Sequence, residues 1–114
     1  MVNRMVNRQS PALDRVFGAL SDPTRRAIIA RLDAAEALTV SEIAAPLPIS
    51  LPAVMKHLDV LEQAGLVTRR KAGRTVTCRL DGKGIRDAMG WLAHYQRFWG
   101  ESLDRLAAIL EDGR

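Results

Sequence analysis

The chain has 114 residues, of which 47% are hydrophobic and 4% aromatic, and its formal net charge is +4. This length predicts one domain with an aliphatic core, and the positive charge favours a polyanionic partner. The single cysteine, Cys78, excludes an internal disulfide framework, and no apolar run is long enough for a membrane-spanning helix or a signal peptide. The expected location is therefore the cytoplasm, without a membrane partner.

The first two helices are predicted from capping signals. Ser10 is a typical N-cap residue and Pro11 suits the first helical position, so a helix should begin there. Residues 1–9 are then expected to be a flexible tail, and residues 10–114 to form one domain. The sequence Ser-Asp-Pro at 21–23 repeats the signal, which predicts the end of the first helix and the start of a second.

A pair of shorter helices is predicted next. Thr39, with Glu42 three residues later, forms a capping box for a helix over about 40–46. A fourth helix is predicted over 50–64, and Gly65 after it suits the left-handed conformation that closes a helix. The positions of this pair that should be buried are Ile43, Leu47, Ile49, Val54, Leu58 and Leu61.

The periodicity then changes from helical to extended. Residues 66–71 and 75–80 have the composition of strands and are separated by a short segment that contains glycine, which predicts a β-hairpin. Cys78 lies within the second strand and is expected to be a small core residue. Between residues 66 and 86 a single acid, Asp81, stands against the basic residues Arg69, Arg70, Lys71, Arg74, Arg79, Lys83 and Arg86. The hairpin is therefore expected to be strongly basic over 69–79.

The last element is predicted to be one long helix over about 85–111. Its apolar residues recur at steps of three, four and seven, which is typical of a helix that pairs along one face. These residues are Ile85, Met89, Leu92, Trp99, Leu103, Leu106 and Leu110.

The predicted fold class is mainly α with a small β-hairpin wing. Two short helices followed at once by a basic hairpin form the winged helix-turn-helix arrangement, whose second short helix enters the major groove of DNA. Polar side chains there can bond to phosphates or base edges, apolar ones can contact thymine methyl groups, and an arginine at the wing tip can enter a minor groove. The candidate DNA-binding residues are Ser50, Leu51, Ala53, Met55, Lys56 and His57 on the helix, and Arg69, Arg70, Lys71 and Arg74 on the wing. Of these, His57 ranks below Lys56, because a packed or capping histidine is the more common case.

Two stretches of the chain resemble a known family. The sequence LSDPTRRAII at 20–29 and the sequence ISLPAVMKHLDVLEQAGLV at 49–67, followed by a Gly-Arg wing, are similar to the ArsR-type winged-helix regulators. The resemblance implies a homodimeric repressor on a promoter palindrome, with the first and last helices at the dimer interface. The interface candidates are Leu13, Val16, Phe17, Leu92, Trp99, Leu103, Leu106 and Leu110.

The resemblance does not extend to the metal sites of the family. The thiolate pair of one group of sensors would fall near 39–43, where this chain has no cysteine, and the carboxylate and histidine pairs of the last-helix sensors are not reproduced. The ending of the chain looks like a metal-independent subgroup. No metal or cofactor is therefore expected. Whether a small-molecule effector binds between aromatic residues at the dimer interface is left open by the sequence.

Two other functional classes fit the sequence less well. An enzyme would need an activated nucleophile, an acid–base pair or an open metal site, and two histidines, one cysteine and no glycine-rich phosphate loop offer little for this. A protein-interaction module that uses the winged helix without specific DNA binding remains an alternative. Arg25 and Arg26 could contact DNA phosphates or have a structural role, and the sequence favours neither.

Overall fold

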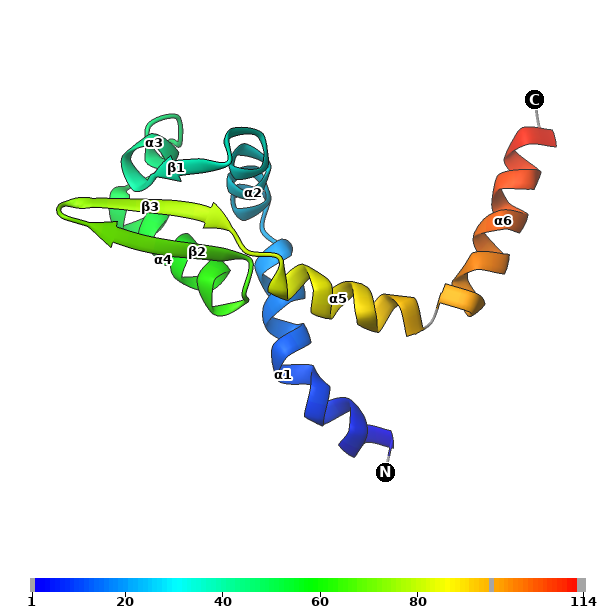
Figure 1. The fold of residues 1–114 in the computed structure, drawn as a ribbon. Helices are drawn as coiled ribbons and strands as arrows, with labels where there is room; N and C mark the ends of the chain where they lie inside the picture. Colours follow the sequence, from blue (N-terminus) through cyan, green and yellow to red (C-terminus); the bar gives the residue numbers. More distant parts are fainter. Residues whose placement is uncertain (1, 95, 113–114) are drawn as a thin grey trace.

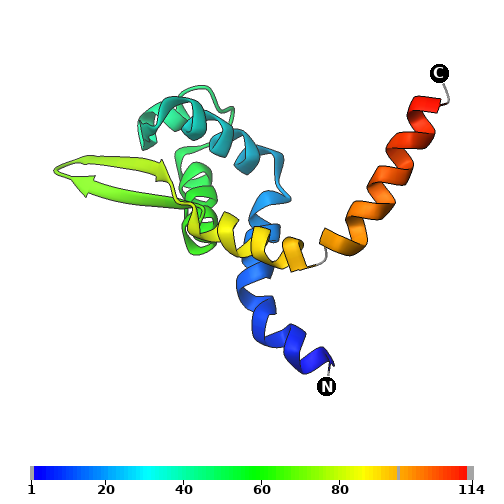
Figure 2. The ribbon, with the colours of Figure 1, turned by 45° about the vertical axis from the view of Figure 1, so that its right-hand side comes forward.

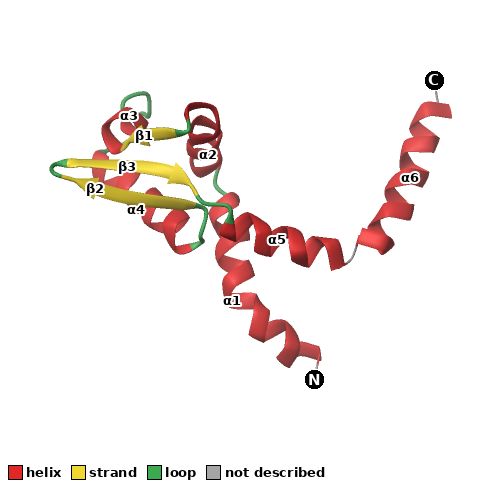
Figure 3. Ribbon diagram, in the orientation of Figure 1, coloured by secondary structure: helices red, strands yellow, loops and turns green. Residues whose placement is uncertain are grey.

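The computed structural model describes residues 2–94 and 96–112. The chain forms helices and a small sheet in the order α1 (Val2–Leu20), α2 (Pro23–Ala35), β1 (Ala37–Thr39), α3 (Val40–Ala44), α4 (Leu51–Gln63), β2 (Val67–Ala72), β3 (Thr75–Leu80), α5 (Lys83–His94) and α6 (Gln96–Asp112). Helices dominate and the β2–β3 hairpin projects beyond them (Figures 1 and 3), which confirms the predicted winged helix-turn-helix fold class.

The core lies between the helix pair, α2 and the sheet. Its largest fully buried side chains are Ile28, Leu32, Ile43, Leu58, Leu61, Leu66, Val16, Val54, Val67 and Cys78. Ile43, Val54, Leu58 and Leu61 are buried as predicted, since they repeat at helical spacing on the inner faces of α3 and α4. Leu47 is only half-buried and Ile49 is 37% exposed, because both lie in the connection between the two helices, outside the periodic pattern.

The capping signals of the helix pair are present in the structure. The Thr39 hydroxyl accepts a hydrogen bond from the Glu42 amide, and the Glu42 carboxylate accepts one from the Thr39 amide. Ser50 caps α4 in the same way, with its hydroxyl 3.2 Å from the Ala53 nitrogen. Gly65 has φ = 72° and ends the turn after α4 as predicted.

The sheet has three antiparallel strands in the order β1-β3-β2. Its first strand was not predicted: Ala37–Thr39 is too short to show a periodicity and pairs with β3, so that Leu38 lies opposite Cys78. Gly73, with φ = 62°, lies in the turn of the hairpin, where Ala72 pairs with Thr75. Cys78 is fully buried as expected.

The first helix begins earlier than predicted. It starts at Val2 rather than at Ser10, so residues 2–9, expected to be a flexible tail, belong to α1, and Pro11 lies inside the helix. Proline has no N–H, so Pro11 removes one hydrogen bond from the ladder without ending it. A Ser-Pro pair therefore could not distinguish the start of a helix from a helix that continues through it.

The predicted single long helix at the end of the chain is wrong. The structure has two helices, α5 and α6, and α6 leads away from the winged domain at an angle to α5 (Figures 1 and 2). Leu106, Ile109 and Leu110 on α6 are 52%, 67% and 65% exposed. The helical periodicity was correct within each helix, but it carries no signal for a change of direction, and nothing in the described residues explains the break.

Candidate nucleic-acid interface

The start of α4 presents a partly exposed face. Leu51 is 55% exposed, Ser50 and Lys56 are exposed, and Ala53 is half-buried. Met55, expected on the outer face, packs instead against the core. The outer face of this helix is therefore narrower than predicted: it contains Ser50, Leu51, Ala53 and Lys56.

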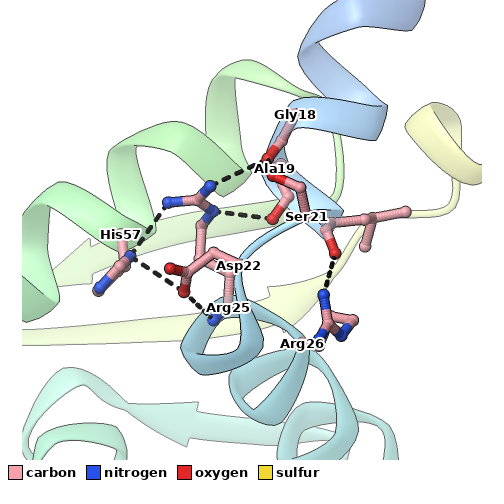
Figure 4. A network of polar contacts seen from close by, with 8 residues as sticks. Gly18, Ala19, Ser21, Asp22, Arg25, Arg26 and His57 are labelled. Carbon is pink, nitrogen blue, oxygen red and sulfur yellow. Dashed lines mark hydrogen bonds and ion pairs between the residues drawn. The ribbon is translucent and has the colours of Figure 1, made fainter.

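His57 takes part in a polar network behind this face (Figure 4). Its Nδ1 lies 3.3 Å from Nη1 of Arg25 and 3.9 Å from the Asp22 carboxylate. Asp22 caps α2 by accepting a hydrogen bond from the Arg25 amide, which lowers the pKa of its carboxyl group. The ring of His57 is thus engaged by Arg25 and Asp22 at the start of α2, which favours a packed histidine over one that contacts DNA.

Two arginines of α2 donate hydrogen bonds to the last carbonyls of α1. The last carbonyls of a helix have no donor within the helix, and Arg25 donates to the carbonyls of Gly18 and Ala19 at 2.9 and 2.8 Å. Arg26 donates to the Leu20 carbonyl at 2.7 Å, as Figure 4 shows. Of the two roles left open for Arg25 and Arg26, the structure therefore favours the structural one.

A third arginine of α2 has the same role at α3. Arg31 donates to the carbonyls of Glu42 and Ile43, both at 2.8 Å. A cation at the C-terminal end of a helix also interacts favourably with the helix dipole. Arg31 thereby links the C-terminal end of α3 to α2.

Arg69 does not belong to the exposed part of the wing. Its Nη2 lies 2.6 Å from the Asp59 carboxylate and 2.7 Å from that of Glu62, both on α4, and its side chain is 16% exposed. The hydrogen bond to Glu62 is the main cause of the raised pKa of Arg69, with that to Asp59 adding to it. Arg69, predicted to contact DNA, thus joins β2 to α4, and this favours a structural role for its side chain.

We expect this contact to be measurable as stability. Arg69→Ala should lower the free energy of unfolding by about 1 kcal/mol, since Asp59 and Glu62 are well exposed and water replaces part of the lost interaction. Urea denaturation measures the change, and Arg70→Ala is the matched control because Arg70 is exposed on the same strand. Equal unfolding free energies for the two variants would contradict the assignment.

The strand register distributes the remaining basic residues over both faces of the wing. Side chains alternate along a strand, so Arg70 faces away from Arg69 and Lys71. Arg79 pairs with Thr68 and therefore shares the face of Arg70, while Arg74 lies in the turn. Arg79 lies in the stretch predicted to be basic over 69–79 but was not among the candidate DNA-binding residues, and its pairing with β2 shows which face of the wing it shares. Within the described part of the chain, no hydrogen bond or ion pair engages the side chains of Lys56, Arg70, Lys71, Arg74 or Arg79.

The predicted dimer residues lie in different surroundings. Val16 is 1% exposed and belongs to the core, so it is not available to a second chain, and Leu13 is half-buried. Phe17 packs edge-on against Trp91 with ring centroids 5.9 Å apart, and both rings remain partly exposed. Leu92, Leu106 and Leu110 are exposed, whereas the side chains of Trp99 and Leu103 lie outside the described residues.

The comparisons with known proteins agree with this geometry. A helix-turn-helix domain family matches residues 20–70. The HTH-type transcriptional regulator Rv2034 of Mycobacterium tuberculosis is 43% identical over 98 residues, which are 86% of this chain and 88% of that protein. A solved ArsR-like transcriptional regulator from Rhodococcus sp. RHA1 is 33% identical, with a TM-score of 0.70 over 90% of this chain and 94% of the other. The chain belongs to the ArsR family of transcriptional regulators.

Membership of the ArsR family identifies the protein as a DNA-binding regulator and not an enzyme. The transcriptional repressor SdpR of Bacillus subtilis is another relative, 31% identical over 73% of this chain and 91% of its own length. Across residues 2–94 and 96–112, no helix is both long and apolar enough to cross a membrane. In the same part of this ArsR-family chain, no three His, Cys, Asp or Glu residues are grouped as metal ligands.

Proposed function

We propose that the protein is a homodimeric repressor that binds a twofold-symmetric promoter site, with α4 in the major groove and the β2–β3 wing beside it. One contrast supports this proposal. Arg25, Arg26, Arg31 and Arg69 all donate to acceptors within the chain, whereas the cations of the outer α4 face and the wing tip are exposed and have no acceptor in the described structure. Polyanionic DNA would supply the missing acceptors.

The proposed readout uses the chemistry of the outer α4 face. Lys56 and Ser50 can bond to base edges or phosphates, although the Ser50 hydroxyl also caps α4. Leu51 and Ala53 offer apolar contacts that would favour thymine methyl groups. Arg70, Lys71 and Arg74 on the wing would contact the backbone or a minor groove, which adds affinity more than sequence preference.

The proposed dimer would form through α1, α5 and α6. Phe17, Leu92, Leu106 and Leu110 are large apolar side chains that remain exposed in the single chain. Exposed large apolar side chains on several helices favour an interaction site, and a second copy is the partner that a twofold promoter site requires. The two copies of α4 would then lie in successive major grooves about 34 Å apart.

Binding to DNA can be tested directly. Fluorescence anisotropy with a random duplex, repeated at several salt concentrations, should show affinity that falls steeply with salt, by about 10³-fold or more between 50 and 200 mM if six or more phosphates are contacted. Selection from a random duplex pool should then enrich a sequence with twofold symmetry. If the protein binds neither the random duplex nor any sequence of the pool, a protein-interaction module becomes the better assignment.

A further inference from the structure

The end of α4 and the start of α5 are joined backbone to backbone. The Gly65 carbonyl, just after α4, accepts a hydrogen bond from the Gly84 amide at 2.9 Å. The next carbonyl, that of Leu66, accepts one from the Asp81 amide, also at 2.9 Å. Two successive carbonyls just after α4 therefore accept hydrogen bonds from amides at or just before the start of α5.

This junction has no room for a side chain. A Cβ atom on Gly84 would lie 2.3 Å from the Ala64 carbonyl oxygen and 3.1 Å from that of Gly65. Both obstacles are backbone atoms, which cannot swing aside as a side chain can. Ala88, one turn later on the same face of α5, is also small and buried. The two helices can approach this closely only because position 84 is glycine.

On its α1 side the junction is flanked by the buried residues Val16 and Ala19 and by the contact of Phe17 with Trp91 of α5. A cleft of about 280 Å³ lies there, lined by residues of α1 such as Ala12 and Arg15 and by Asp87 of α5. The backbone contact at Gly84 joins the end of α4 to the start of α5 directly, while α1 packs against both helices.

We propose that Gly84 is a positioning residue that sets the direction of the DNA-reading helix relative to the dimer-forming helices, and thereby the half-site spacing that the protein accepts. This inference rests on the proposed function. The start of α4 lies about 20 Å from the junction, at 1.5 Å per residue over thirteen residues. A rotation of roughly 10° at the junction would move that end by about 3.5 Å, which is the rise of one base pair.

The experiment compares two alanine substitutions on one helix. Gly84→Ala introduces the clash, whereas Gly90→Ala on α5 is the control because a Cβ there meets no atom within 4 Å. Both variants and the unmodified protein are titrated, at fixed salt, into duplexes that contain two copies of the selected half-site with the spacing changed in steps of one base pair. Light scattering and binding to a random duplex are measured alongside.

We expect Gly84→Ala to remain a dimer and to bind the random duplex normally. At the spacing that the unmodified protein prefers, its affinity should fall about tenfold, the cost of misplacing one base-pair contact, and its preferred spacing should shift or broaden. Gly90→Ala should match the unmodified protein. Equal spacing profiles for all three proteins, or an equal loss on every duplex, would overturn the inference.

Two further outcomes are distinguishable. If Gly84→Ala does not fold, Gly65→Asn tests the same junction more mildly, since asparagine tolerates a positive φ and its Cβ would lie 3.3 Å from the Gly84 nitrogen. An unchanged spacing profile for that variant would overturn the inference. If the unmodified protein selects no twofold site at all, the proposed function itself fails.

Discussion

Lys56→Glu should lower the affinity for the selected operator about 100-fold or more. The substitution removes a DNA contact worth about 1–3 kcal/mol and adds a negative charge beside the phosphates. In the proposed symmetric dimer both effects occur twice. Arg74→Glu at the wing tip should also weaken binding, with a smaller effect on sequence preference. Anisotropy titrations at several salt concentrations would measure both effects.

The matched control for this pair is Lys83→Glu. It changes the charge by the same amount, but Lys83 lies at the start of α5, beside the end of α4 farthest from Ser50. The operator affinity of this control should stay close to that of the unmodified protein. Equal losses for Lys56→Glu and Lys83→Glu would mean that net charge alone, and not the outer face of α4, determines binding.

Leu106→Asp should convert the proposed dimer to a monomer and weaken operator binding by about 10²-fold or more, since the second half-site then loses its tethered partner. Leu106 is 52% exposed, and burying a carboxylate in an apolar interface would be strongly unfavourable. Light scattering measures the mass, and anisotropy the affinity.

Ala108→Asp provides the control on the same helix. At 100° per residue, position 108 lies nearly opposite Leu106 on α6, and Ala108 is exposed. This variant should stay dimeric and bind DNA normally. If Leu106→Asp is also dimeric, the interface lies away from that face of α6.

Assigning the arginines of this protein requires their three-dimensional surroundings. Arg69 and Arg70 are identical neighbours in the sequence, yet one lies against Asp59 and Glu62 and the other is exposed on the opposite face of β2. Arg25 reaches carbonyls of α1 and the ring of His57, which is 32 residues away. A basic run in the sequence therefore overestimated the surface available to DNA.

Local signals in the amino-acid chain were enough to place the helix pair and the hairpin. Thr39, Glu42, Ser50 and Gly65 act on amides or on a backbone conformation within a few residues, so their effect could be inferred without knowing the rest of the fold. The same holds for the helical spacing that buries Leu58 and Leu61.

Contacts between separate elements produced strand β1, the pairing of Arg69 and the close approach of Gly84 to Ala64. These features depend on atoms that are brought together by folding and are far apart along the chain. Capping and periodicity describe one element at a time. The packing of the elements against one another determines which cations stay exposed and could contact DNA.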